Sequence, residues 1–204
     1  NGCVSVRDTV ELSVNEAPSV SFDASSTQEV CEGESIELDV TASGGDGSYT
    51  YEWYHDGTLI SGVSTASYTI NNSTLSDDGT YEVVAVDGSG CSSTAAQLDV
   101  TVHPLPNATL SRDPQYFIEG QTVEFTAGGG DEYAFYVNGS ELQARSTDNV
   151  FQTSSLQDQD SVSVQVYSSF GCRSDAWDVV TVYDDIVPPE VTVTDSAFCE
   201  GSPG

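Results

Sequence analysis

Apolar and polar residues alternate in short runs along most of the chain, and no stretch repeats its apolar residues at helical spacing. A run with period two is typical of a strand that buries one face. Thr, Val, Ser and Tyr are abundant in these runs, and this composition also favours strands. The clearest runs place apolar residues at positions 36, 38 and 40, at 98, 100 and 102, at 162, 164 and 166, and at 180 and 182.

Glycine and aspartate interrupt the runs at short intervals. Asp56-Gly57 and Asn138-Gly139 are strong signals for two-residue hairpins, because both central residues of such a turn adopt positive φ. Short strands with turns at this spacing predict an all-β chain of tandem immunoglobulin-like β-sandwich domains.

Two short sequence patterns recur at distances that fit whole domains. The segment Cys31-Glu32-Gly33 returns as Cys199-Glu200-Gly201, 168 residues later, and a degenerate copy begins at Ile118. A Gly-Cys pair recurs as well, with its cysteines at positions 3, 91 and 172. Such self-similarity indicates a repeat array.

Proline marks the expected seams between repeats, since it is stiff, lacks a backbone donor and suits a short linker. It occurs at positions 18, 104, 106, 188 and 189, each time between two predicted strands. We therefore expect residues 1–16 to be the last strand of a preceding repeat and 188–204 to begin a following one. The complete repeats are predicted at 17–102 and 104–183.

Three aromatic residues are the expected core of these repeats. Trp53 lies where the buried tryptophan of the third strand of an immunoglobulin sandwich belongs, and Tyr81 lies at the tyrosine corner before the sixth strand. Phe135 takes the place of Trp53 in the second repeat, where Val162 replaces the corner tyrosine. Val83 stands where the second core cysteine would be, so apolar packing is expected instead of an inter-sheet disulfide.

The charge of the chain narrows the range of partners. The formal net charge is −29, all four basic residues are arginines and there is no lysine. Nucleic acid is therefore not expected as a partner, because phosphate contacts need clustered basic residues. No apolar run reaches the roughly 20 residues that span a bilayer, so no direct membrane insertion is expected. If the protein is secreted, we expect its signal peptide upstream of residue 1.

Across the whole chain these patterns, together with the Phe135–Gly139 and Ser155–Val162 segments, resemble the tandem Ig-like and PKD-like repeats of very large Bacteroidota surface proteins. That group includes gliding-motility adhesins of the SprB type. The resemblance implies an extracellular filament at the bacterial cell surface, exported by the type IX secretion system. Ile118 departs from the family pattern, which has cysteine there, and the motifs define no adhesive residues.

Five cysteines at repeat-locked positions favour disulfides and an oxidising compartment. We expect Cys31 to open the second strand and Cys91 the last strand of one sandwich. These points are separated by about 25 Å of strand, whereas a disulfide needs Cα atoms within about 7 Å. We therefore favour an interdomain Cys31–Cys172 bridge. The alternative is Cys31 with Cys91 and a free Cys172.

Acidic loops raise the question of calcium. Asp77 and Asp78 are expected at one end of the first sandwich, and Asp131 and Glu132 in a loop of the second. Carboxylates from several loops suit calcium, but no EF-hand spacing is present. We expect solvated loops here, with calcium as the alternative and no other cofactor.

Two further features concern the surface. Thr9, Ser161 and Ser196 each follow an aspartate and precede an apolar residue, in the short O-glycosylation pattern of the group that the chain resembles. Trp177 aligns with polar Gln97. It could face outward, where aromatics bind sugars or partners, but we favour a bulge that turns it inward.

Catalysis is not expected. The two histidines stand alone in the sequence, and the chain has no nucleophile elbow or phosphate-binding loop. We predict a noncatalytic repeat segment of a secreted filamentous adhesin, with neighbouring repeats, surface polysaccharide or other cells as partners. The alternatives are a carbohydrate-binding or spacer module of a secreted hydrolase, and a fibre subunit that exchanges strands with its neighbours.

Overall fold

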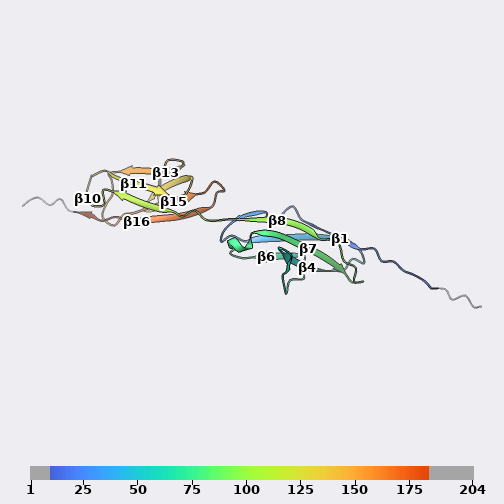
Figure 1. Cartoon of the computed structure of the whole chain (residues 1–204). Coiled ribbons are helices and arrows are strands. Elements are labelled where there is room, and N and C mark those ends of the chain that lie inside the picture. Colours follow the sequence, from blue (N-terminus) through green and yellow to red (C-terminus); the bar gives the residue numbers. More distant parts are fainter. Residues whose placement is uncertain (1–9, 184–204) are drawn as a thin grey trace, which may run out of the picture. The chain divides into compact units, whose positions relative to one another are not determined.

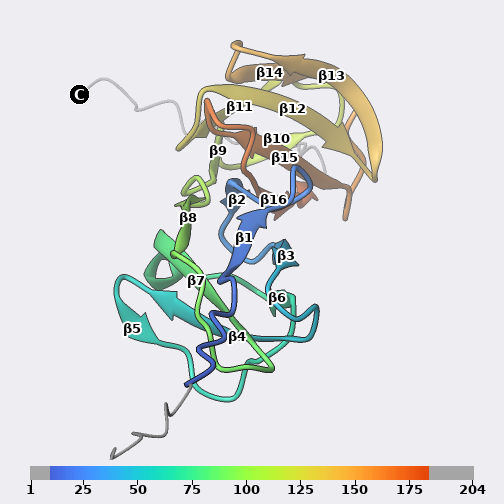
Figure 2. The same ribbon diagram turned by 90° about the vertical axis from the view of Figure 1, so that its right-hand side faces the viewer.

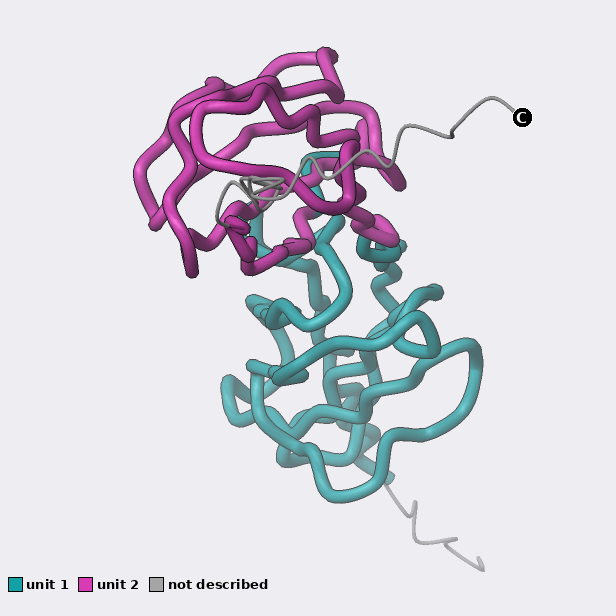
Figure 3. Tube along the Cα trace, turned by 90° about the vertical axis from the view of Figure 1, so that its left-hand side faces the viewer, with its two compact units in different colours: residues 1–105, 170–172 teal, residues 106–169, 173–204 magenta. Residues whose placement is uncertain are grey.

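The computed structural model describes residues 10–183. They form two compact units, which Figure 3 colours separately. Unit 1 comprises the chain up to Leu105 together with residues 170–172, and unit 2 comprises 106–169 and the chain from Arg173 onward.

Unit 1 is a sandwich of two β-sheets (Figure 1). The first sheet has the order β1-β3-β6 and the second the order β2-β8-β7-β4-β5. β2 runs parallel to β8, and the other pairs are antiparallel. The strands are β1 (Pro18–Phe22), β2 (Glu29–Cys31), β3 (Ile36–Gly44), β4 (Tyr49–His55), β5 (Thr58–Leu59), β6 (Ser67–Ile70), β7 (Gly79–Asp87) and β8 (Ala96–His103), with a short 3-10 helix, η1 (Leu75–Asp77).

Unit 2 repeats this plan. One sheet has the order β14-β11-β9 and the other β13-β12-β15-β16, which is seen at the top of Figure 2. The short β10 pairs in parallel with β17, as β2 does with β8 in unit 1. The strands are β9 (Thr109–Asp113), β10 (Phe117–Ile118), β11 (Val123–Gly128), β12 (Glu132–Val137), β13 (Ser140–Ser146), β14 (Val150–Thr153), β15 (Ser161–Tyr167), β16 (Arg173–Val179) and β17 (Val182–Tyr183). The predicted all-β fold of tandem immunoglobulin-like sandwiches is confirmed.

The alternating residues of the sequence fill the two cores. In unit 1 Trp53 is fully buried, and its indole Nε1 donates a hydrogen bond to the Thr65 carbonyl at 2.9 Å. Tyr81 is buried as well, and its hydroxyl donates to the Asp77 carbonyl at 3.0 Å, which is the hydrogen bond of a tyrosine corner. In unit 2 Phe135 and Val162 occupy the matching positions and are fully buried.

The two hairpins signalled by Asp-Gly and Asn-Gly are present. Asp56 and Gly57 have φ of 47° and 74°, and Asn138 and Gly139 have φ of 50° and 79°. The first turn joins β4 to β5 and the second joins β12 to β13. Positive φ at both central residues explains why the sequence uses Asp or Asn followed by Gly.

Of the two terminal segments expected to belong to neighbouring repeats, the structure describes only residues 10–16. Residues 10–16 form no strand, and Val10, Leu12 and Val14 are 83–89% exposed. Their alternation predicts a strand, but no described strand pairs with them. The expected repeat at 188–204 lies outside the described residues, as do Cys3 and Cys199. Within residues 10–183, no helix is long and apolar enough to cross a membrane.

Candidate functional site

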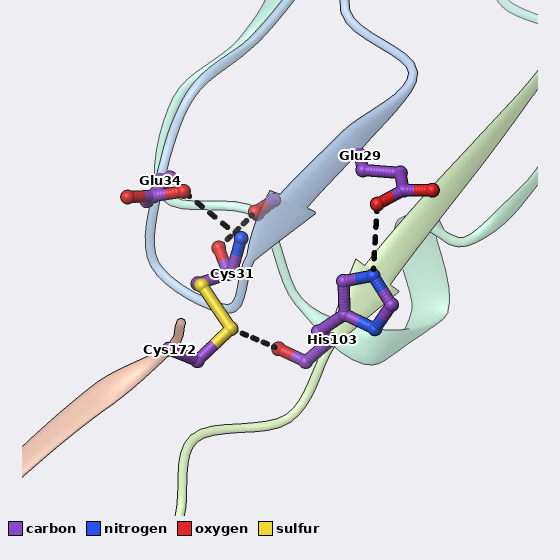
Figure 4. Close-up of a disulfide and its surroundings, with 6 residues drawn as sticks. Glu29, Cys31, Glu34, His103 and Cys172 are labelled. Atoms are coloured by element: carbon purple, nitrogen blue, oxygen red, sulfur yellow. Dashed lines mark hydrogen bonds and ion pairs between the residues drawn. A yellow bond between two sulfur atoms is a disulfide. The ribbon is translucent and has the colours of Figure 1, made fainter. Parts of the chain in front are cut away.

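A disulfide joins Cys31 to Cys172 across 141 residues of sequence, with Cα atoms 5.4 Å apart (Figure 4). This is the pairing favoured by the sequence analysis, and Cys91 is a free thiol. Residues 170–172 belong to unit 1, although the strands before and after them, β15 and β16, belong to the main sheet of unit 2. The bond therefore ties the β15–β16 connection to the turn that follows β2.

The strand positions of the cysteines differ from the expected ones. Cys31 ends β2 and does not open the next strand, which begins at Ile36. Cys91 lies in the loop before β8, whereas Cys172 directly precedes β16. The sequence analysis assigned Cys31 to the start of the strand that is β3 in the structure. Cys31 lies one strand earlier, in β2, which is only three residues long and shows no alternation.

The recurring Cys-Glu-Gly pattern is a tight turn that presents the cysteine. Gly33 has φ of 89°, and the Cys31 backbone N–H donates to the Glu34 carboxylate at 2.9 Å. Ser73 holds the turn from the side, since its carbonyl accepts from the Gly33 N–H at 2.7 Å. This role of Glu34 was missed in the sequence, although Glu34 follows the recurring segment directly.

Unit 2 keeps the same turn without the cysteine. Gly120 has φ of 79°, and the Ile118 N–H donates to the Gln121 side-chain oxygen at 3.4 Å. Gln121 thus takes the place of Glu34, and Ile118 takes the place of Cys31. The turn is a property of the repeat, and the disulfide is an addition to it.

His103 lies beside the disulfide on β8, directly opposite Cys31 in the strand register. Its ring stacks on Phe170 with centroids 3.9 Å apart and planes at 12°. Its Nε2 is buried, has no hydrogen-bond partner among the described residues, and lies 3.5 Å from the Glu29 carboxylate (Figure 4). The stacked Phe170 ring positions the loop that carries Cys172, so the loop has an apolar contact as well as the covalent one.

A hollow of about 320 Å³ adjoins the disulfide. It is lined by two carboxylates, one imidazole, one phenyl ring and the Cys31 backbone. Its lining has neither a hydroxyl side chain nor a free thiol. The lining residues are Glu29, Val30, Cys31, Glu34, His103, Phe170 and Gly171.

Three of the four calcium candidates, Asp77, Asp78 and Glu132, have carboxylates bonded to nearby protein groups, whereas Asp131 is held through its backbone. The Asp77 carboxylate accepts the Thr74 N–H at 2.8 Å, and the Asp78 carboxylate accepts the Val102 N–H at 3.0 Å. Glu132 pairs with Arg145 at 2.5 Å, and the Asp131 N–H donates to the Tyr167 carbonyl. No group of three or more acidic, histidine or cysteine side chains gathers at metal-binding distance within the described part of the chain.

Of the glycosylation candidates, Thr9 and Ser196 lie outside the described residues. Ser161 is the half-buried first residue of β15, and its backbone N–H donates to the Asn138 side chain at 3.0 Å. The neighbouring Asp160 accepts hydrogen bonds from the Gln157 N–H and the Asn138 amide, and these hold the pKa of Asp160 below its usual value. Asp160 is thus part of the turn that starts β15.

The expected inward bulge at Trp177 is wrong. Trp177 is 71% exposed and lies opposite Ser163 in an unbroken β15–β16 register. The next residue, Asp178, points the other way and pairs with Arg112 on β9 at 2.5 Å. Because Arg112 neutralises this inward carboxylate, β16 needs no bulge.

The first repeat is similar to known Ig-like domains. Residues 16–104 match the family model described as "Ig-like domain CHU_C associated". A decoration protein of Escherichia phage T5 is 39% identical over 85 residues, which are 42% of this chain and 52% of that protein. The match therefore spans about half the length of the curated relative.

Solved structures with similar folds are more distant in sequence. Fibronectin(III)-like modules of Clostridium thermocellum CbhA are 19% identical with a TM-score of 0.43, over 80% of this chain and 93% of theirs. The three N-terminal domains of the Hoc outer capsid protein of bacteriophage RB49 are 18% identical with a TM-score of 0.40, over 81% of this chain and 59% of theirs. The strand order of unit 1 fits the Ig-like fold that the family match indicates for residues 16–104.

Proposed function

We propose that this chain is a noncatalytic repeat segment of a secreted, filamentous cell-surface adhesin, in which it supplies length, stiffness and display. The observation that carries the proposal is the Cys31–Cys172 bond, because it ties a loop between two strands of the second repeat to a turn of the first. A spacer benefits from such a bond, since a covalent tie removes conformational freedom that a proline linker alone would leave.

Several properties of the chain support a location outside the cell. A stable disulfide suits an oxidising compartment. The net charge of −29 keeps a long array soluble and suppresses self-association. The phage relative is a decoration protein by name, and we propose a surface role for this chain too. The bacterial cell surface and export by type IX secretion follow from the sequence resemblance and belong to this proposal.

The absence of enzymatic activity is also part of the proposal. The first repeat matches an Ig-like family model, and Ig-like domains generally serve in binding or spacing. The partners we propose are neighbouring repeats of the same polypeptide, with surface polysaccharide or other cells as the targets of adhesion.

Small-angle X-ray scattering of the full chain tests the stiffening role. We expect the oxidised wild type to give a narrower distribution of dimensions than the Cys31→Ser/Cys172→Ser variant, because the variant lacks the covalent tie. Cys91→Ser is the matched control and is expected to scatter like the wild type, since Cys91 is unpaired. Identical profiles for wild type and the double variant would contradict stiffening by the disulfide.

A further inference from the structure

The outward face of the β12-β15-β16 sheet in unit 2 differs from the rest of this acidic chain. The inward residues Val162, Val164 and Val166 are fully buried, so the alternate residues of β15 point outward. The strand register arranges this outward face in rows across the three strands. The rows are Tyr136–Ser163–Trp177, Ala134–Gln165–Asp175 and Glu132–Tyr167–Arg173.

The first row places two aromatic residues on either side of a serine. Trp177 is 71% exposed, and Ser163 separates it from Tyr136. Neighbouring strands lie about 4.8 Å apart, so the two aromatic residues stand about 10 Å apart with only a serine between them. An indole face this exposed is available to a ligand from solvent.

Hydrogen-bonding groups gather beside this row. The Tyr167 hydroxyl donates to the Gln165 side-chain oxygen at 2.7 Å, and the Tyr136 hydroxyl, which donates to the Glu141 carboxylate at 3.0 Å, lies 3.2 Å from the same oxygen. Because its oxygen is engaged in this way, the Gln165 amide nitrogen presents its donors outward, and it has no hydrogen-bond partner within residues 10–183. Gln165 is thus fixed in place and still able to donate to a ligand.

Most charges on this face are paired with one another. Arg145 bonds Glu132 at 2.5 Å and lies 4.0 Å above the Tyr167 ring, and Arg173 lies 3.5 Å from Asp175. Glu141 of β13 has no arginine partner in the described part of the chain and accepts the Tyr136 hydroxyl at 3.0 Å. Two of the four arginines of the chain therefore lie on this one face, which carries a formal charge of only about −1, whereas the chain as a whole carries −29.

The matching face of unit 1 is an internal comparison. Its equivalent row is Tyr54–Glu82–Gln97, in which Gln97 donates to the Glu82 carboxylate. The tyrosine is kept, while a carboxylate stands in the place of Ser163 and a polar side chain in the place of Trp177. Residues 17–105 contain no arginine. A sandwich of this family therefore folds without these features, which points to a role for them other than stability.

We propose that this outward face of unit 2 binds an uncharged polysaccharide, which specifies the adhesion target of the proposed function and rests on that proposal. A pyranose ring has a face of C–H groups that stacks on an aromatic ring and a rim of hydroxyls that bonds amides and alcohols. Trp177 supplies the stacking surface, and Ser163 and Gln165 supply the polar groups beside it. A protein partner is the poorer fit, because the core of a protein interface is contiguous and apolar, whereas Trp177 has polar neighbours on β15.

Native affinity electrophoresis of the full chain tests this proposal. The probes are hydroxyethylcellulose, arabinoxylan, galactomannan and dextran in separate gels, with alginate as the anionic comparison. We expect at least one uncharged polysaccharide to retard the wild type, and Trp177→Gln to weaken that retardation at least tenfold. Ser163→Glu, which copies Glu82 of unit 1, is expected to weaken it similarly. Tyr116→Gln is the matched control, because Tyr116 is equally exposed in the same unit but lies off this face.

Three results would overturn the proposal: no retardation in any of the four uncharged gels, retardation by alginate alone, or unchanged binding by Trp177→Gln. Thermal melting checks that each variant is folded. A protein retained from a cell-surface extract by the wild type and not by Trp177→Gln, without any polysaccharide binding, would assign the face to a protein partner instead. The scattering test of stiffness involves different residues, so the two proposals can fail separately.

Discussion

Trp53 and Phe135 occupy equivalent positions in the two sandwiches. Both rings are fully buried, an indole in unit 1 and a phenyl ring in unit 2. The Trp53 indole also donates a hydrogen bond to the Thr65 carbonyl, which the phenyl ring of Phe135 could not do. Trp53 therefore contributes both apolar burial and a hydrogen bond inside the core of unit 1.

We expect Trp53→Phe to lower the free energy of unfolding of unit 1 by about 1–2 kcal/mol, because it removes the hydrogen bond and leaves a small void. Trp53→Ala should lower the free energy of unfolding of unit 1 by about 3–5 kcal/mol. Calorimetry of the full chain measures both. Trp177→Phe is the control and should leave the unit 1 transition unchanged, since Trp177 is exposed in unit 2.

Tyr81 makes the stability of unit 1 depend on pH in the alkaline range. Burial is the main cause that raises the pKa of Tyr81 above its ordinary value of 10.0, and nearby carboxylates raise the pKa further. Above about pH 10 the unfolded chain releases this proton while the folded chain keeps it. The free energy of unfolding therefore falls as pH rises, by up to about 1.4 kcal/mol per pH unit for this group.

Tyr81→Phe is expected to lower the stability at pH 7 by about 1 kcal/mol, through loss of the bond to Asp77. It should also reduce the loss of stability between pH 10 and 11.5, which urea unfolding at several pH values measures. Tyr116→Phe serves as the exposed control. An equal alkaline slope for wild type and Tyr81→Phe would show that Tyr81 is not the group responsible.

At the scale of the elements, the hairpins and the alternating strands could be predicted from the sequence because their causes are local. The turn at Asn138-Gly139 could be predicted because these two residues readily adopt positive φ. The strand β15 could be predicted because its buried valines occur at every second position. The short strands β2 and β10 could not be predicted, because two or three residues carry no pattern. They are strands because β8 and β17 pair with them.

The sequence left the position of Trp177 open, because its alignment with polar Gln97 allowed an outward side chain. Its hydrophobicity favours burial, whereas the strand register puts it beside Ser163 on the solvent face. What decides the matter is Arg112, a residue far away in sequence that accommodates Asp178 on the inner side. Such a long-range ion pair has no signal in the local pattern of β16.

The β12–β13 turn gives a prediction for a single element. Gly139 has φ of 79°, and an added Cβ would meet no atom within 4 Å. Gly139→Ala should therefore cost only the backbone penalty, about 1–2 kcal/mol, in the unfolding of unit 2. Gly57→Ala should do the same to unit 1. A Tm of unit 2 that is unchanged by Gly139→Ala would mean that the turn does not need its left-handed glycine.

At the scale of the whole molecule, the Cys31–Cys172 disulfide could be predicted from the positions of the cysteines in the repeats. The expected distance between Cys31 and Cys91 within one sandwich was too long for a disulfide, and this favoured Cys31 with Cys172. The stacked pair His103 and Phe170 beside the bond was not foreseen, since each residue is alone in the sequence and only the fold brings their rings together.

Removing the disulfide should destabilise the chain measurably. The bond closes a loop of 141 residues, so Cys31→Ser/Cys172→Ser should lower the free energy of unfolding by about 2–4 kcal/mol. Thermal melts with and without reductant measure this loss. Reductant should shift the wild type towards the double variant and leave the double variant unchanged, and Cys91→Ser should melt like the wild type.

Disulfide mapping of the oxidised, non-reduced chain tests the central claim most directly. Trypsin, which cleaves after arginine, places Cys31 and Cys91 together in peptide 8–112 and Cys172 in peptide 146–173. A glutamate-specific protease then separates Cys31 from Cys91. We expect a peptide containing Cys31 to be linked to one containing Cys172, and Cys91 to be alkylated. This is the result predicted for repeats joined by the disulfide. Cys31 linked to Cys91, with Cys172 alkylated, would contradict it.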